Sequence, residues 1–187
     1  MQTLSVIVPC YNEEAVIQEF YRRTKEVLNS LDDVVGYIIF INDGSKDNTR
    51  YILDHIASQD DKARVIHFSR NFGHQPAVTA GMNLCKTDLA VIIDADLQDP
   101  PELIPDLIET QRKEEASVVY CVRKKREGET AFKKATAKLF YRTMNNLSEV
   151  EFPEDTGDFR LIDRKAINAF NGLKEKGKYI RGTYAAG

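Results

Sequence analysis

The sequence predicts an α/β fold in which a mostly parallel sheet is flanked by helices. Short, almost wholly apolar runs alternate with segments in which apolar residues recur at helical spacing, a pattern typical of β-α-β units. The apolar runs lack polar alternation, so we expect helices on both faces of the sheet. A chain of 187 residues with 42% hydrophobic content is long enough for one sizeable core. We therefore expect residues 1–187 to form a single domain.

The expected strands cover residues 4–9, 37–41, 65–68, 89–94 and 117–122, and the expected helices cover 13–31, 49–57, 75–84 and 101–115. Pro9 ends the first strand because it lacks an N–H donor, Asn12 suits the cap of the next helix, and Glu13 and Glu14 suit its first turn. After residue 122 we predict a basic loop (123–129), an amphipathic helix (130–147), an acidic loop (149–158), a strand (159–162) and a helix (164–172).

The net charge of −3 conceals an uneven distribution, since acidic residues dominate 1–122 and basic residues dominate 123–142. Cys10, Cys85 and Cys121 lie in or beside apolar segments, which indicates reduced thiols rather than disulfides or a zinc site. We expect no signal peptide, and no stretch approaches the roughly 20 apolar residues that cross a bilayer.

Two carboxylates one residue apart follow the apolar run at 89–93. Asp94 and Asp96, with Gln98 two residues further on, offer the oxygen ligands that hard divalent cations prefer. Ligands of open α/β sheets bind beyond the carboxyl ends of the strands, where these residues would lie. A solvated acidic turn is the alternative, but a charge at the edge of a buried sheet is costly without a partner. The motif therefore predicts a divalent ion that holds a diphosphate.

Two other strand ends carry polar groups suited to a nucleoside. Tyr11 could stack on a base, and Asp43 could accept hydrogen bonds from ribose while Gly44 lets the backbone come close. A capped helix start accounts for most of the first segment but does not require Tyr11, and an ordinary turn explains Asp43 and Gly44 equally well. Neither the G-x-G-x-x-G nor the P-loop pattern is present, which leaves a dinucleotide or P-loop fold unsupported.

These segments together resemble glycosyltransferase family 2, and within it the polyprenyl-phosphate branch of bactoprenol glucosyltransferases and dolichyl-phosphate mannosyltransferases. The resemblance rests on SVIVPCYNEE (5–14), INDGSKDNT (41–49), SRNFGHQ (69–75), DADLQDPPE (94–102) and DTGDFRLIDR (155–164). It implies a GT-A fold, which is Rossmann-like, and inverting transfer of a hexose from a nucleotide diphosphate sugar to a polyprenyl phosphate. Glucose from UDP-glucose is the favoured donor, with GDP-mannose as the alternative.

The resemblance also implies roles for individual residues. Asp158, Asp96 and Arg123 would be catalytic, and Asp94, Asp96 and Gln98 would hold Mg²⁺ or Mn²⁺. The nucleotide would be bound by Pro9, Tyr11, Glu13, Asp43, Gly44, Asp94 and Ala95.

A basic patch of Arg126, Lys133, Lys134 and Lys138 is compatible with an anionic membrane surface and with the acceptor phosphate, although most charge runs are merely solvated. We expect no nucleic-acid partner and regard a homo-oligomer as possible. Family members continue into membrane helices that this sequence lacks, and they act at the cytoplasmic face of the membrane. His55 and His67 are interpreted as structural, while His74 could approach the nucleotide.

Two other functions compete with the transferase. A haloacid-dehalogenase-like phosphatase also places D-x-D after a strand, but it expects Thr or Val where this chain has Gln98. A nucleotide-sugar sensor without catalysis would use the same binding residues, so the sequence leaves it open.

Overall fold

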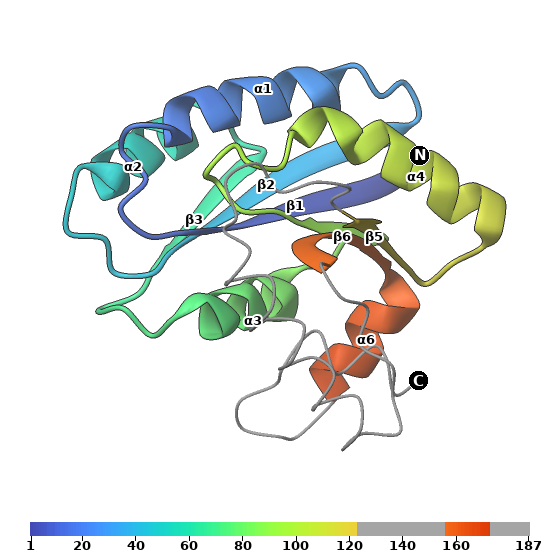
Figure 1. Cartoon of the computed structure of the whole chain (residues 1–187). Coiled ribbons are helices and arrows are strands. Elements are labelled where there is room, and N and C mark those ends of the chain that lie inside the picture. The colour runs from blue at the N-terminus through green and yellow to red at the C-terminus, as the bar shows by residue number, and fades with distance from the viewer. Residues whose placement is uncertain (123–155, 173–187) are drawn as a thin grey trace, which may run out of the picture.

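In the computed structural model, which describes residues 1–122 and 156–172, a six-stranded sheet lies between two layers of helices (Figure 1). The strands are β1 (Gln2–Cys10), β2 (Val34–Asn42), β3 (Ala63–His67), β4 (Leu89–Ile92), β5 (Val118–Val122) and β6 (Thr156–Asp163). The helices are α1 (Ile17–Asn29), α2 (Thr49–Gln59), α3 (His74–Leu84), α4 (Ile104–Glu114) and α6 (Arg164–Gly172), and a 3₁₀ turn, η1 (Pro101–Leu103), precedes α4. The predicted basic loop, amphipathic helix and most of the acidic loop lie outside the described residues.

The strands are ordered β3-β2-β1-β4-β6-β5. β1 pairs in parallel with β2 and β4, and β2 pairs in parallel with β3. β6 is antiparallel to both of its neighbours, β4 and β5. The predicted α/β class with a mostly parallel sheet is therefore confirmed, and the insertion of β6 between β4 and β5 is a feature that the strand pattern did not reveal.

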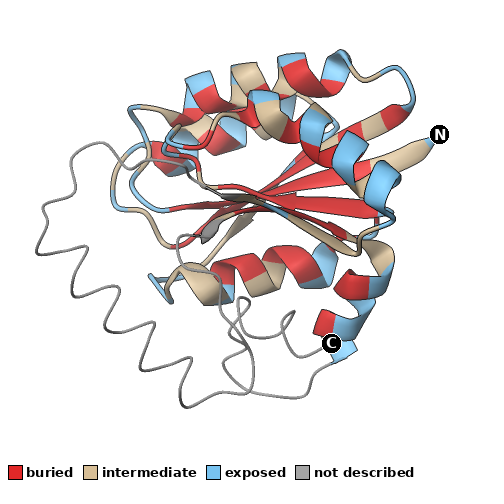
Figure 2. Ribbon diagram, turned by 45° about the vertical axis from the view of Figure 1, so that its right-hand side comes forward, coloured by how far each residue is buried: buried red, intermediate tan, exposed pale blue. Residues whose placement is uncertain are grey.

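Helices cover both faces of the sheet, as predicted. α1, α2 and α4 lie on one side, and α3 and α6 lie on the other (Figure 1). The inner strands β1, β2 and β4 are almost entirely buried, whereas the edge strands β3 and β5 are partly exposed, and each helix turns its buried stripe toward the sheet (Figure 2). Along β1, Val6 and Val8 pack into the cluster below α1, whereas Ile7 packs into the cluster beside α3. Successive side chains of a strand point to opposite faces, so an apolar run is what a doubly covered strand requires.

Close contact between α3 and the sheet depends on Gly81. A Cβ atom at this position would lie 2.4 Å from Ile7 Cγ2 and 2.9 Å from Ile41 Cδ1. The absent side chain thus lets α3 approach β1 and β2. The approach matters for function because the first residue of α3, His74, reaches the edge of the sheet where the strands end.

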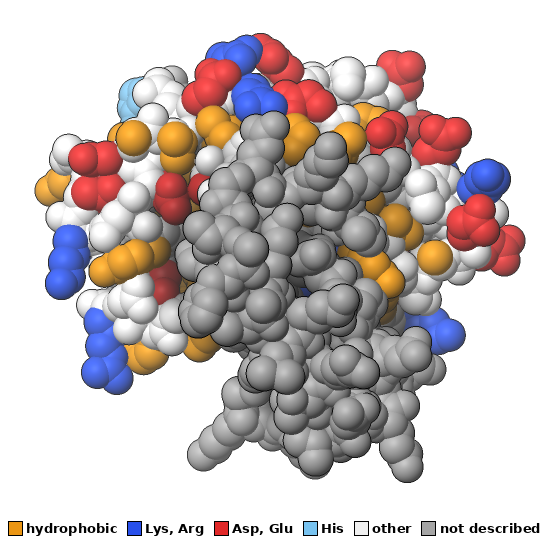
Figure 3. Space-filling view, viewed as in Figure 1, with side chains coloured by type: hydrophobic (Ala, Val, Ile, Leu, Met, Phe, Trp, Pro, Cys, Tyr) orange, Lys and Arg blue, Asp and Glu red, His pale blue; other side chains and the backbone are white. Residues whose placement is uncertain are grey.

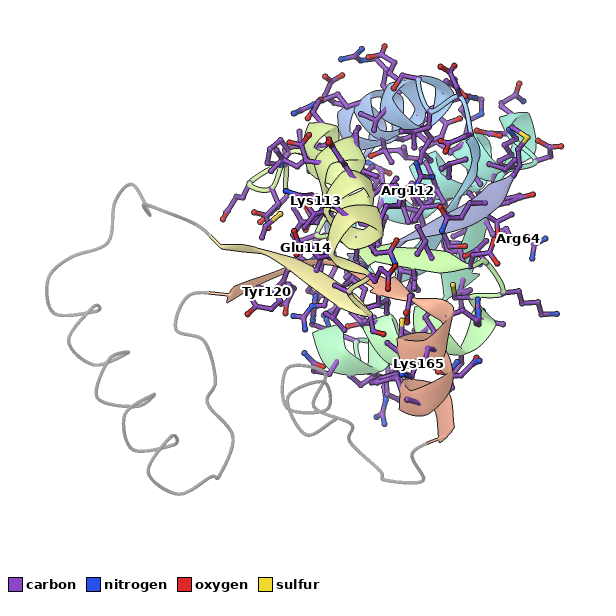
Figure 4. All side chains as sticks on the ribbon, turned by 90° about the vertical axis from the view of Figure 1, so that its right-hand side faces the viewer. Arg64, Arg112, Lys113, Glu114, Tyr120 and Lys165 are labelled. Atoms are coloured by element: carbon purple, nitrogen blue, oxygen red, sulfur yellow. The ribbon has the colours of Figure 1, made fainter. Side chains whose placement is uncertain are left out.

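The outer surface is charged on the side of α1 and α4. Figure 3 shows Asp and Glu side chains beside Lys and Arg side chains over this layer. Arg22 bonds Glu19 and Glu26 along α1, and Arg23 joins α1 to Glu102 of η1. In Figure 4 the charged end of α4, marked by Arg112, Lys113 and Glu114, and the start of α6, marked by Lys165, lie on opposite sides of the sheet. These exposed pairs contribute little to stability individually.

The prediction that a helix begins at residue 13 is wrong, because α1 begins at Ile17. Asn12 does not cap that helix, and Val16 occupies the N-cap position without a side-chain bond. The side chain of Asn12 instead accepts a hydrogen bond from the backbone N–H of Lys46 at 2.8 Å. A contact with a loop 34 residues away has replaced the local cap that the sequence suggested.

Two strand boundaries also differ from the prediction in ways that affect the site. β4 ends at Ile92, so Asp94 lies in the following turn rather than in the strand. β6 begins at Thr156, so Asp158 lies inside a strand that pairs with β4 and β5. The helix predicted at 164–172 has the bounds of α6.

Candidate functional site

The carboxyl ends of β1, β2 and β4 lie side by side because β1 is parallel to both neighbours. The segments that follow these strands, together with the start of α3, enclose a cleft of about 300 Å³. Open α/β sheets bind their ligands in this position. The residues that line the cleft are Pro9, Cys10, Tyr11, Glu13, Asp43, Asn71, Gly73, His74, Ala77, Asp94, Ala95 and Asp96.

The loops that follow β1 and β2 are joined by reciprocal hydrogen bonds. The backbone N–H of Asn12 donates to Ser45 Oγ at 2.9 Å. Glu14 Oε2 accepts from the backbone N–H of Asn48 at 2.8 Å, at the residue that precedes α2. Glu14 therefore satisfies a donor at the start of α2 rather than lying in the first turn of α1. This bracing holds Tyr11 at the cleft with 39% of its surface exposed.

Asp43 anchors the loop that leads into α3. Its side chain is buried, Oδ1 accepts from the backbone N–H of Phe72 at 2.7 Å, and Oδ2 accepts from that of Gly73 at 2.8 Å. Gly44 follows with φ of 67°, and a Cβ there would lie 2.4 Å from the carbonyl carbon of Arg70. Asp43 and Gly44 thus set the position of the loop that forms one wall of the cleft.

Three side chains from distant parts of the chain meet at one edge of the cleft. His74 Nε2 lies 2.9 Å from Asp94 Oδ1 and 4.0 Å from Asp158 Oδ2. One ligand atom from each of these residues lies within 4.8 Å of the others, and all three residues are partly buried. The buried Arg160 donates to Asp158 Oδ1 from Nη2 at 3.1 Å, which orients this carboxylate. Two carboxylates and one imidazole form a donor set suited to a divalent metal ion.

Negative charge accumulates in the cleft. Burial raises the pKa of the Glu13 carboxyl, and the charges of Asp96, Asp94 and Asp47 raise it further. Burial also raises the pKa of the Cys10 thiol, with Glu13 and Asp94 adding to the effect, so this thiol stays neutral at pH 7. A diphosphate would be repelled by such a cleft unless a cation were bound with it.

The two carboxylates of the D-x-D pair lie in the segment after β4 and make different contacts. Asp96 Oδ1 accepts from the backbone N–H of Gln98 at 3.0 Å, and Leu97 between them has φ of 61°. Asp96 lines the cleft near Glu13 but is not one of the three residues in the group of possible metal ligands.

Most of the residues predicted to bind a nucleotide line the cleft: Pro9, Tyr11, Glu13, Asp43, Asp94 and Ala95. Gly44 does not line it and packs against Arg70 instead. Asp158 does not line the cleft, but its Oδ2 lies 4.0 Å from Nε2 of His74, which does. Other predicted residues, Arg123, Arg126, Lys133, Lys134 and Lys138, lie outside the described residues.

Sequence reasoning gave too little weight to His74 and did not notice Arg160. A signal for His74 was present, because the segment 69–75 follows the strand β3, which is parallel to β2. The rule that the ends of parallel strands meet at one edge applies to this strand as it does to the other three. Arg160 gave no such signal, since only the pairing of β6 with β4 places it there.

The fold and the cleft together define an α/β protein with an acidic ligand site, compatible with a metal ion, at the carboxyl edge of its sheet. The family model of Glycosyl transferase family 2 matches residues 5–170, and the chain belongs to this family. The predicted family is therefore confirmed, and the dehalogenase-like interpretation loses its support.

Curated relatives point to the predicted branch of the family. The chain is 51% identical over 178 residues to the uncharacterized glycosyltransferase YkcC of Bacillus subtilis, covering 95% of this chain and 54% of that protein. It is 38% identical to the bactoprenol glucosyl transferase of Shigella phage SfV, covering 96% of this chain and 58% of the relative. The prophage bactoprenol glucosyl transferase homolog of Escherichia coli is 37% identical with the same coverage. The chain thus spans little more than half the length of these relatives.

Solved structures confirm the GT-A fold. Glucosyl-3-phosphoglycerate synthase from Mycobacterium tuberculosis, in complex with UDP, has a TM-score of 0.64 at 22% identity, covering 90% of this chain and 59% of that one. A mannosyltransferase from Pyrobaculum calidifontis, in complex with GDP-Man and Mn²⁺, has a TM-score of 0.66 at 17% identity, covering 96% and 50%. Within residues 1–122 and 156–172, no helix is both long and apolar enough to cross a bilayer.

Proposed function

We propose that residues 1–187 form the single GT-A catalytic domain of an inverting, metal-dependent glycosyltransferase that moves a hexose from a nucleotide diphosphate sugar to a polyprenyl phosphate. The observation that carries this proposal is the acidic cleft at the ends of β1, β2 and β4 in a chain of this family. The relatives named bactoprenol glucosyl transferases, at 37% and 38% identity, support a lipid phosphate as acceptor and glucose as sugar. UDP-glucose is accordingly the favoured donor.

Different residues of the cleft would contact the base, the ribose and the diphosphate of the donor. The Tyr11 ring would stack on the base, with Pro9 and Glu13 also lining the cleft. Asp43 lies where its carboxylate oxygens would accept hydrogen bonds from the ribose hydroxyls. Asp94 and Asp96 follow β4 and line the cleft, and together with Gln98, two residues further on, they would hold Mg²⁺ or Mn²⁺ on the diphosphate. Ala95 between the two carboxylates is buried and small, which leaves room for the donor.

The chemistry of the residues present fits such an ion. The charge of a bound diphosphate adds to the carboxylates that already raise the pKa of Glu13, so donor binding needs a cation. When bound, the metal supplies electrostatic stabilisation of the nucleoside diphosphate that departs. Carboxylate oxygens at the ends of strands are suited to hold it.

Asp158 is proposed to orient the acceptor. A phosphate monoester has a second pKa of about 6 and is largely ionised near neutral pH, so a strong base is not needed. The contact with Arg160 fixes one oxygen of Asp158, and the other is directed toward His74 at the cleft edge. Arg123 is proposed to face the donor diphosphate.

The acceptor is a lipid, so we propose that the protein works at the cytoplasmic face of the membrane. The basic residues Arg126, Lys133, Lys134 and Lys138 are proposed to contact the anionic surface there. The chain covers only 54% and 58% of two of these relatives, and their remaining length could provide the attachment. Association into a homo-oligomer also stays a prediction.

An assay of donor use tests the proposal. The chain is incubated with UDP-glucose, GDP-mannose or UDP-N-acetylglucosamine and a short polyprenyl phosphate in detergent, with and without Mn²⁺. We expect transfer that requires metal and is fastest with UDP-glucose. The Asp96→Ala variant should lose this transfer, whereas Asp106→Ala, which removes an exposed carboxylate of α4, should keep it.

Each contrary result has a definite meaning. Equal transfer by Asp96→Ala and the wild type would refute the role of Asp96. Tight donor binding without turnover on any acceptor would favour the nucleotide-sugar sensor, and faster transfer from GDP-mannose would favour a mannosyltransferase.

A further inference from the structure

We propose that His74 is a ligand of the metal ion, together with Asp94 and Asp158, and that its imidazole makes the site prefer a divalent first-row transition ion over Mg²⁺. This inference rests on the proposed function only in assuming that the bound metal ion serves sugar transfer. The three residues come from the start of α3, the turn after β4 and the strand β6, so only the folded sheet brings them together.

The distances already approach those of a shared ion. His74 Nε2 lies 2.9 Å from Asp94 Oδ1, and the three ligand atoms are within 4.8 Å of one another. Ligand bonds of about 2.0–2.2 Å place opposite ligands of one ion about 4.2 Å apart. Small rotations of the side chains are therefore enough to close the group around a cation.

Two of the three residues are positioned by contacts outside the group. His74 begins α3 directly after the loop whose backbone N–H groups bond to Asp43. Asp158 is fixed by Arg160 through the oxygen that does not face His74. Supporting contacts of this kind orient ligands and increase the affinity of metal sites. The arrangement is thus prepared for binding rather than assembled from mobile surface groups.

The mixed donor set determines which ion is favoured. Mg²⁺ prefers oxygen ligands in a nearly ideal octahedron and gives up its water reluctantly. An imidazole nitrogen beside carboxylates is better suited to first-row transition ions. Asp94 is shared with the D-x-D motif, so His74 and Asp158 extend the set of ligands that this motif offers.

Electron paramagnetic resonance with Mn²⁺ as the probe tests the assignment directly. Titrations compare the wild type with His74→Gln, which can still donate a hydrogen bond to Asp94 but lacks the imidazole nitrogen. His55→Gln, at an exposed position of α2, is the matched control. We expect the dissociation constant for Mn²⁺ to rise at least about tenfold in His74→Gln, because the loss of even a supporting contact typically weakens metal binding by about that factor. The constant for Mg²⁺ should change much less, and His55→Gln should match the wild type.

A spectroscopic signature separates ligation from a merely structural role. Electron spin echo envelope modulation of Mn²⁺ bound to protein labelled with ¹⁵N-histidine should show a directly coordinated nitrogen in the wild type and in His55→Gln, and none in His74→Gln. The wild-type signal does not depend on how well any variant folds. Absence of nitrogen coupling in the wild type, or unchanged Mn²⁺ affinity in His74→Gln, overturns the proposal.

The transfer assay distinguishes this inference from the proposed function. Nitrogen coupling in a wild type that transfers no sugar would refute the function and leave the ligand assignment standing. Metal-dependent transfer by a wild type without nitrogen coupling would refute only the role of His74.

Discussion

Replacement of Asp43 by Asn tests whether one buried carboxylate holds the wall of the cleft. Each of its oxygens accepts a backbone N–H, from Phe72 and from Gly73, and the residue is only 3% exposed. Asn keeps one acceptor, so one of these N–H groups would face the amide NH₂ and lose its partner.

The magnitude follows from these two bonds. Hydrogen bonds to charged groups contribute about 1.5–3 kcal/mol each, and an unpaired buried donor costs about 1–3 kcal/mol. We expect Asp43→Asn to lower the free energy of unfolding by about 2–4 kcal/mol, a large part of the roughly 5–15 kcal/mol typical of a domain. The loop carries Asn71, Gly73 and His74 into the cleft, so UDP affinity should fall as well.

Urea denaturation followed by circular dichroism measures the stability, and calorimetric titration measures the UDP affinity. Asp61→Asn, at an exposed position before β3, serves as control and should change neither. A loss of stability below about 0.5 kcal/mol, the usual range for surface substitutions, would contradict the anchoring role. A loss of UDP affinity without any loss of stability would instead indicate direct contact between Asp43 and the nucleotide.

Three further substitutions test other parts of the structure. Gly44→Ala forces a Cβ to within 2.4 Å of the backbone of Arg70 at a φ of 67°. We therefore expect the free energy of unfolding, measured by urea denaturation, to fall by more than about 1 kcal/mol. An unchanged denaturation midpoint would contradict this close packing. Because burial and the charge of Asp96 raise the pKa of Glu13, its ionised form destabilises the metal-free fold. Stability relative to Glu13→Gln should therefore be lower at pH 7 and recover as pH falls through the raised pKa, and parallel pH profiles would refute this. Phe159→Ala leaves a cavity in the core beside β4 and should lower the free energy of unfolding by about 3–5 kcal/mol. A loss below about 1 kcal/mol would contradict this and mean that neighbouring side chains fill the cavity.

Local sequence patterns predicted the fold class because their causes are local. The short apolar run at 89–93, which is rich in β-branched residues, favours a buried strand, and the helical spacing at 164–172 matches α6. Tyr11, Asp43 and Asp94 could be assigned to one edge because parallel strands connected through helices end on the same side. The prediction for Asn12 was wrong because its side chain bonds to the loop after β2, and propensity does not encode such a partner.

The sequence by itself determined the α/β order, the burial of both sheet faces and the presence of carboxylates where β4 ends, since these depend on side-chain periodicity over a few residues. Only the tertiary structure decided that β6 inserts beside β4 and that His74, Asp94 and Asp158 meet. Strand order depends on which long-range pairing buries the most surface and satisfies the most backbone groups. A cluster assembled from three elements that lie far apart along the chain therefore has no local signature.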